Sequence, residues 1–256
     1  MSAPILRVEG LSKAWGGVHA VRSVDFFVQA GECLALIGPN GAGKTTCFNM
    51  VNGQIAPDAG RVFLESRDIT GLAPRAIWRL GVGRTFQITA TFSSMTVREN
   101  VQMALLSLRG GLGACLAPAR RAFSDEAQAL LDRVGIGAQA ERACGVLAYG
   151  DLKRVELAIA LANAPRLLLM DEPTAGMAAG ERVELMALTA ALARERGIAV
   201  LFTEHDMDIV FTHADRILVL DRGTLIADGT PAAVRGNAAV RAVYLGSGDF
   251  DGRAGA

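Results

Sequence analysis

The sequence contains few lysines and no excess of either charge. Its 256 residues include 26 lysines and arginines against 26 aspartates and glutamates, so the net charge is zero. Proteins that bind nucleic acid through electrostatics need a basic face that displaces counterions from phosphates. The composition argues against that class, and we expect no nucleic-acid partner. Lysine occurs only as Lys13, Lys44 and Lys153, which makes a lysine within a chemical motif more informative than usual.

Cysteine pairs are also missing. The four cysteines are far apart and lack the short spacings of zinc sites or redox pairs; they are Cys33, Cys47, Cys115 and Cys144. We therefore expect reduced thiols, mostly buried as small apolar groups. Hydrophobic residues make up 51% of the chain and charged residues 20%, which excludes a disordered solvating chain and provides for a sizeable core.

Long apolar segments are absent as well. The best candidate, residues 158–170, is interrupted by Asn163, Pro165 and Arg166 and is shorter than the roughly 20 residues that span a bilayer. The first ten residues contain Arg7 and Glu9, unlike the apolar centre of a secretory signal. We expect a protein that stays in the cytosol and does not itself cross a membrane.

The first part of the chain has the pattern of an α/β nucleotide-binding fold. Strand patterns at residues 5–8, 24–28 and 33–37 precede a glycine-rich loop, and a helical pattern covers residues 44–51. A strand, a glycine loop and a helix in this order form the local unit of such folds. We predict that residues 1–87 are the first part of the nucleotide-binding core.

The rest of the chain divides into three further parts. Residues 88–165 have helical patterns, including a helix that starts after Ser124 as N-cap and stops at Gly135, and we predict that they form a helical insertion. Residues 166–246 return to alternating strands and helices, with expected strands at 167–170, 198–202, 216–220 and 224–226 and an expected helix at 232–244. Residues 247–256 are expected to be a disordered tail.

A phosphate-binding loop is the clearest motif. Residues 38–45 read Gly-Pro-Asn-Gly-Ala-Gly-Lys-Thr and match G-x-x-x-x-G-K-[ST]. In this motif backbone N–H groups surround phosphate oxygens at a helix N-terminus, lysine adds a charge, and the hydroxyl binds Mg²⁺. The predicted nucleotide-binding residues are Gly38, Pro39, Asn40, Gly41, Ala42, Gly43, Lys44, Thr45 and Thr46.

A second motif follows a buried strand. Residues 167–170 are Leu-Leu-Leu-Met, and Asp171 and Glu172 come directly after them. Ligands of α/β sheets bind at the carboxyl ends of the strands. We expect Asp171 to hold Mg²⁺ and Glu172 to polarise a water that attacks the γ-phosphate.

With these motifs the chain resembles the ATP-binding subunit of ABC transporters, from about residue 5 to 246. The resemblance implies that Trp15 stacks on adenine, that Gln87 reaches Mg²⁺ and the attacking water, and that His205 is the switch histidine at the γ-phosphate. It also implies catalytic roles for Lys44 and Glu172. The signature loop, which would bind the partner subunit's nucleotide in trans, corresponds to Ala148, Tyr149, Gly150 and Asp151.

Two positions depart from that family's usual pattern. Ala148 stands where the signature has serine, so a hydroxyl contact to the partner's γ-phosphate is missing. Ala178 stands where the loop after Pro173 and Thr174 usually reaches aspartate. Both positions face the partner in the family, so both departures concern coupling across the dimer.

Finer resemblance concerns residues 83–87, 95–101, the Leu-Ala-Tyr-Gly signature and residues 244–246, which are similar to an ATPase subunit of branched-chain amino-acid importers. This implies a peripheral protein on the cytoplasmic face of the bacterial inner membrane that hydrolyses Mg²⁺-ATP at a dimer interface. The implied partners are a second, different ATPase subunit, transmembrane permeases and, indirectly, a periplasmic solute-binding protein. For the apolar residues 105–118, packing within the insertion and contact with a membrane-embedded partner or the lipid interface remain alternatives.

Two other classes of ATPase or GTPase remain alternatives. A soluble ABC-type ATPase acting on ribosomes or DNA would have paired cassettes or long coiled-coil insertions, and this chain has one cassette and no sustained heptads. A P-loop kinase or GTPase is opposed by the signature loop and by the absence of an N-K-x-D guanine motif. The predicted fold is an α/β P-loop nucleotide-binding core with a mostly parallel sheet, an antiparallel β piece near the N-terminus and a helical insertion.

Overall fold

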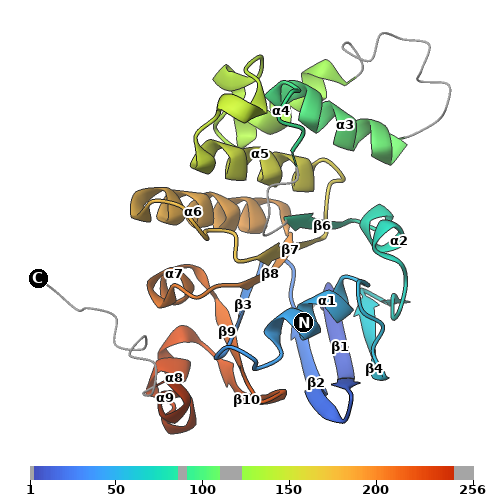
Figure 1. The fold of residues 1–256 in the computed structure, drawn as a ribbon, viewed down its shortest axis with the longest axis vertical. Helices are drawn as coiled ribbons and strands as arrows, with labels where there is room; N and C mark the ends of the chain where they lie inside the picture. Colours follow the sequence, from blue (N-terminus) through green and yellow to red (C-terminus); the bar gives the residue numbers. More distant parts are fainter. Residues whose placement is uncertain (1–2, 86–90, 110–122, 245–256) are drawn as a thin grey trace, which may run out of the picture.

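The computed structural model describes residues 3–85, 91–109 and 123–244 (Figure 1). Its larger sheet has the strand order β10-β9-β3-β8-β7-β6. β9, β3, β8, β7 and β6 run parallel, and β10 joins β9 antiparallel at the edge, so the predicted mostly parallel sheet is confirmed. The strands are β3 (Cys33–Ile37), β6 (Val82–Thr85), β7 (Leu167–Asp171), β8 (Ala199–Thr203), β9 (Arg216–Asp221) and β10 (Thr224–Gly229).

The second sheet is antiparallel, as predicted for the N-terminal region, and has the order β2-β1-β4-β5. Its strands are β1 (Leu6–Trp15), β2 (Val18–Val28), β4 (Ala59–Leu64) and β5 (Arg67–Asp68). The predicted first two strands were too short, because register shifts between β1 and β2 interrupt the two-residue alternation on which the prediction depended. β4 and β5 were not predicted.

Helices cover the larger sheet, and further helices lie at both ends of the molecule. In Figure 1, α3, α4 and α5 gather at one end of the molecule, and α8 and α9 lie at the other. The helices are α1 (Lys44–Val51), α2 (Pro74–Arg79), α3 (Val97–Arg109), α4 (Ser124–Arg133), α5 (Tyr149–Leu161), α6 (Ala179–Arg196), α7 (Met207–His213), α8 (Pro231–Gly236) and α9 (Ala238–Tyr244), with short 3₁₀ turns at Gly137–Gln139 and Cys144–Val146. None of the described helices combines the length and hydropathy that crossing a bilayer requires.

Two helix predictions were wrong in detail. Ser124 is the first residue of α4 and not its N-cap; the cap position is Phe123, which has a φ of 58° and gives no side-chain hydrogen bond. Arg98 Nη1 lies 3.4 Å from the Ser124 hydroxyl instead. The helix predicted at 232–244 is divided at Asn237, whose Oδ1 accepts hydrogen bonds from Ala239 N and Val240 N and so starts α9.

The larger sheet separates two apolar cores. Along β3, Cys33, Ala35 and Ile37 face the core beneath the helices, and Leu34 and Leu36 face the core shared with the antiparallel sheet. Side chains alternate between the two faces of a strand, so a strand buried on both faces reads as a continuous apolar run. The three described cysteines are free and buried, as predicted; the fourth, Cys115, lies outside the described residues.

Ala178 leaves an incomplete cap at the start of α6. Ala178 is the N-cap residue, and Glu181 Oε2 already accepts a hydrogen bond from its N–H at 3.3 Å. Alanine cannot return a bond to the first turn, whereas serine would complete a capping box. We predict that Ala178→Ser raises the free energy of unfolding by about 1 kcal/mol, measured from urea midpoints at constant slope.

Ala191→Ser is the matched control, because Ala191 is exposed in the interior of α6. That change should lower stability by about 0.5 kcal/mol through helix propensity. Equal effects of the two substitutions would contradict the capping argument.

Candidate functional site

The phosphate-binding loop connects β3 to α1. Gly43 has a φ of 103°, and a Cβ there would lie 2.2 Å from the carbonyl oxygen of Ala20. Only glycine therefore fits at this position, which directly precedes the first residue of α1. The Lys44 ammonium donates hydrogen bonds to the carbonyl oxygens of Gly38 at 2.6 Å and Pro39 at 3.2 Å. The loop thus folds back over its own lysine.

Burial lowers the pKa of Lys44, while the Glu172 and Asp171 carboxylates raise it. The residue is 8% exposed. The buried ammonium has lost most of its hydration, and the two neighbouring carboxylates offset only part of that loss. A phosphate brought to this loop would supply the missing negative charge.

The carboxyl ends of β7 and β8 hold the two predicted carboxylates. Asp171 pairs with Thr203 in the strand register, and the Thr203 hydroxyl donates to Asp171 Oδ1 at 2.8 Å. The same hydroxyl and the Thr203 carbonyl accept from the N–H of Glu172, each at 3.1 Å. Glu172 has a φ of 49°, a conformation that costs a non-glycine residue energy unless its surroundings fix it. Thr203 provides that fixation.

His205 follows β8 and reaches the same place. Its Nε2 lies 2.9 Å from Oε1 of Glu172. The imidazole is about half exposed, and the Glu172 side chain is 24% exposed. The pair is therefore accessible to a ligand and stands beside the phosphate-binding loop.

A hollow of about 210 Å³ brings these groups together. It lies between the phosphate-binding loop and the ends of β7 and β8. Its lining consists of Ala20, Asn40, Gly41, Ala42, Gly43, Lys44, Thr45, Thr46, Glu172 and His205. Asp171 is buried beside it at 8% exposure. Gln87 falls outside the described residues.

Trp15 stands at the end of β1 and is 54% exposed. The Lys13 ammonium lies 4.8 Å from the centroid of its indole and 2.6 Å from Asp58 Oδ1. Asp58 also accepts a hydrogen bond from the N–H of Ala14 at 2.8 Å. These contacts fix the end of β1, where the exposed indole of Trp15 lies.

The predicted signature loop leads into α5. Ala148 is the N-cap residue and offers no side-chain hydrogen bond. Tyr149 is 40% exposed, and its ring lies against Gly176, where an added Cβ would be 3.3 Å from Cε1. A Cβ on Gly150 would lie 2.8 Å from the Glu181 carboxyl carbon. The signature residues thus pack on the segment that follows Glu172 in the same chain.

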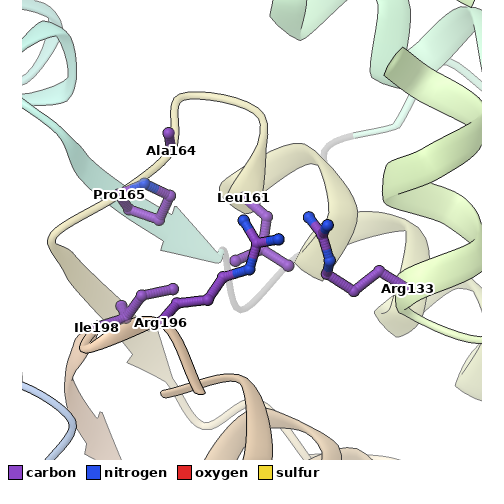
Figure 2. A pocket seen from close by; sticks show the side chains of 6 residues that line it. All are labelled: Arg133, Leu161, Ala164, Pro165, Arg196 and Ile198. Carbon is purple, nitrogen blue, oxygen red and sulfur yellow. The ribbon is translucent and has the colours of Figure 1, made fainter. Parts of the chain in front are cut away.

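Another hollow, of about 330 Å³, lies at the opposite ends of the strands (Figure 2). Figure 2 shows Arg133 and Arg196 extending toward Leu161; these three are the last residues of α4, α6 and α5. Helix C-termini carry partial negative charge, which arginines there neutralise. Among the described residues, no glycine loop or carboxylate lines this hollow, so it differs from the hollow beside the phosphate-binding loop.

Two residues that organise the site, Thr203 and Glu204, belong to no motif of the sequence and directly precede His205. The buried Asn100 has a similar structural role at the segment of Phe92. Asn100 is 3% exposed and bonds both the N–H and the carbonyl of Phe92. The hydrogen bonds of Thr203 to Asp171 and of Glu204 to Thr174 join residues 32 and 30 positions apart, and no spacing rule reveals such pairs.

Comparison with known proteins agrees with this architecture. Residues 21–175 match the ABC transporter family, and residues 224–249 match a branched-chain amino acid ATP-binding cassette transporter family. The chain is 43% identical over 253 residues to the high-affinity branched-chain amino acid transport ATP-binding protein LivG of Salmonella typhimurium, covering 96% of this chain and 99% of that protein. It is 41% identical over the same shares to BraF of Pseudomonas aeruginosa, which has the same description.

A solved structure gives the same result. The ADP conformation of MJ1267, an ATP-binding cassette of an ABC transporter, matches with a TM-score of 0.85 and 31% identity over 96% of this chain and all of that one. The fold and site therefore define a P-loop ATPase of the cassette type. The chain belongs to the ABC transporter family, as an ATP-binding subunit that hydrolyses ATP.

We predict that two substitutions separate ATP binding from ATP hydrolysis at this site. Lys44→Ala removes the only described ammonium lining the hollow, and we predict at least about tenfold weaker ATP binding, since bonds to charged groups contribute about 1.5–3 kcal/mol.

Glu172→Gln keeps the shape of the side chain but not its basicity, so ATP affinity should persist while turnover falls by about 10²–10⁴-fold. Nucleotide titration and phosphate release measure the two effects.

Glu195→Gln serves as the control, because Glu195 is exposed near the end of α6. Parental turnover in Glu172→Gln would refute the assigned role of that carboxylate.

Proposed function

We propose that this chain is the ATPase subunit of an importer that takes up branched-chain amino acids or a related small polar solute. The observation that carries this proposal is the identity of 43% over nearly the whole of both chains to a relative named for branched-chain amino acid transport. The match of residues 224–249 to a family named for the same transport supports it at the C-terminal end. The solute does not enter the ATPase, so its identity comes by similarity.

Within this function, the hollow beside the phosphate-binding loop holds the triphosphate of ATP. Lys44 would pair with the β- and γ-phosphates, Thr46 would support the α-phosphate, and Trp15 would stack on adenine. The Glu172 carboxylate would accept a hydrogen bond from the attacking water and orient that water. His205 would lie at the γ-phosphate. The distance of 2.9 Å between His205 Nε2 and Glu172 Oε1 supports a joint role of these two side chains.

The residues present fit Mg²⁺ as the cofactor. Oxygen donors are the ligands this ion prefers, and the site offers the Thr45 hydroxyl at the start of α1 and the Asp171 carboxylate at the end of β7. We propose these two residues and Gln87 as the groups that hold it. When bound, Mg²⁺ would neutralise charge on the β- and γ-phosphates.

Hydrolysis takes place when two ATPase subunits close on the nucleotide. The residues that would face the partner's nucleotide are Ala148, Tyr149, Gly150 and Asp151, at the N-terminus of α5. Backbone N–H groups at a helix N-terminus bind anions, and this contribution does not need the missing serine. Closing the dimer would exclude bulk water from the γ-phosphate.

The membrane partner would dock around residues 87–96, of which the structure describes 91–96. Phe92 and Val146 are exposed apolar residues, 58% and 66% respectively, on segments joined by a hydrogen bond from Gly145 N to Ser93 O. Exposed apolar groups of this kind mark interaction sites. Because the segment 144–146 leads directly into the signature loop, docking here would act on the part of the subunit that closes over the nucleotide.

The proposed partners are a second ATPase subunit, permease subunits and, through the permeases, a solute-binding protein of the periplasm. The subunit would lie peripherally on the cytoplasmic face of the bacterial inner membrane.

Uptake of labelled leucine tests this function. We expect a strain that lacks this gene to lose high-affinity leucine uptake and to regain it with the parent chain but not with Glu172→Gln.

The Phe92→Asp variant should also fail to restore uptake, because loss of an interface anchor costs about 2 kcal/mol or more, yet it should retain parental ATP affinity. Phe27→Asp, at a 42% exposed phenylalanine of β2, should restore uptake. Unchanged uptake in the deleted strain would refute the assigned solute.

The alanine in the signature predicts a heterodimer. We expect the isolated chain to associate weakly, because a charge-assisted hydrogen bond of about 1.5–3 kcal/mol is missing at both sites of a homodimer. In the Glu172→Gln background, Ala148→Ser should strengthen ATP-dependent self-association about tenfold or more by sedimentation. Serine would also cap α5, so the comparison is between association with and without ATP.

Ala138→Ser, at an exposed residue of a 3₁₀ turn, is the control. A tight ATP-dependent homodimer of the parent that Ala148→Ser leaves unchanged would contradict the heterodimer.

A further inference from the structure

Glu204 is a buried carboxylate for which the roles above give no use. It is 4% exposed and lies between Thr203 and His205 at the end of β8. Its Oε1 accepts from the Thr174 N–H at 2.9 Å and from the Thr174 hydroxyl at 2.7 Å. Its Oε2 accepts from the N–H of His205 at 3.2 Å. The two bonds to Oε1 thus join the segment after β7 to the segment after β8, and the bond to Oε2 lies within the segment after β8.

The segment after β7 contacts the signature loop, and the segment after β8 contacts the Glu172 carboxylate. Thr174 begins the loop 174–178, in which Gly176 packs against the ring of the signature residue Tyr149. On the other side, His205 Nε2 reaches Glu172 Oε1 at 2.9 Å. Glu204 is the group between the loop and the histidine.

A second connection holds the same two segments further along. Arg182, in the first turns of α6, donates from Nε to the carbonyl of Met177 at 2.8 Å and from Nη1 to Asp206 Oδ2 at 2.8 Å. This connection is partly exposed. The connection at Glu204 is buried, because Glu204 is 4% exposed and Thr174 is 2% exposed.

We propose that Glu204 is a positioning residue for ATP hydrolysis, which holds loop 174–178 and His205 as one unit. A displacement of the loop, transmitted through Tyr149 and Gly176, then moves the imidazole relative to Glu172. A carboxylate suits this role because it accepts three hydrogen bonds and donates none. The inference rests on ATP hydrolysis at this site and is independent of the solute that is transported.

Glu204→Gln tests the inference with little change of shape. An amide has one acceptor oxygen, so its NH₂ group must face either the N–H of His205 or that of Thr174. Two donors then oppose each other in a buried place. We expect kcat for Mg²⁺-ATP to fall at least tenfold, while the KM for ATP stays within twofold because the phosphate-binding loop is untouched. Glu195→Gln, exposed near the end of α6, should keep both parental constants.

Thr174 provides a second test that does not alter the carboxylate. Thr174→Val removes the hydroxyl bond to Glu204 Oε1 and should lower kcat with KM unchanged, and Thr174→Ser keeps that bond and should retain parental kcat. In the double variant with Glu204→Gln, the loss should be smaller than the product of the single losses, because both changes act on one linkage.

Several results would overturn the inference. These are parental kcat in Glu204→Gln, equal changes of kcat and KM, multiplicative losses in the double variant, and equal loss of kcat in Thr174→Val and Thr174→Ser. If Glu204→Gln does not fold, as judged by ATP titration, the Thr174 pair decides the question. Failure of the parent chain to bind and hydrolyse Mg²⁺-ATP would instead refute the site itself.

Discussion

The proposed nucleotide site depends on the pairing of β7 with β8. Within the strands, the register sets Asp171 beside Thr203. Beyond the strands, side chains continue the same pairing: Thr203 holds Asp171 and the backbone of Glu172, and His205 contacts the Glu172 carboxylate. A parallel pair of buried strands is among the most rigid parts of an α/β fold. The strand pairing therefore fixes the positions of the Asp171 and Glu172 carboxylates.

This arrangement accounts for the strain at Glu172. A positive φ at a residue with a long side chain persists only where neighbours determine it. Thr203 accepts twice from the Glu172 N–H, and the carbonyl of Glu172 accepts from Ala175 N at 3.2 Å. These bonds fix the peptide on both sides, and the turn they produce aims the carboxylate at the phosphate-binding loop.

Much of the fold could be predicted from the sequence, because its main signals are periodic. The apolar run at residues 167–170 predicted β7, and the glycine loop predicted the turn before α1. β4 and β5 escaped prediction because their residues do not alternate clearly, and the end of β1 escaped because of register shifts. At the site, motif spacing selected Lys44, Glu172 and His205, and the structure brings these three side chains to one hollow. Motif spacing could not identify Glu204, whose role depends on a contact with Thr174, 30 residues away.

The three lysines of the chain give a final connection between composition and site. Lys44 lies in the phosphate-binding loop, Lys13 lies 4.8 Å from the Trp15 ring centroid, and Lys153 lies 5.4 Å from that of Tyr149. Lys153 is 3% exposed and pairs with Glu156 at 3.0 Å, so breaking that pair would leave a buried charge uncompensated. Each lysine therefore stands beside a group to which we assign a role in nucleotide binding.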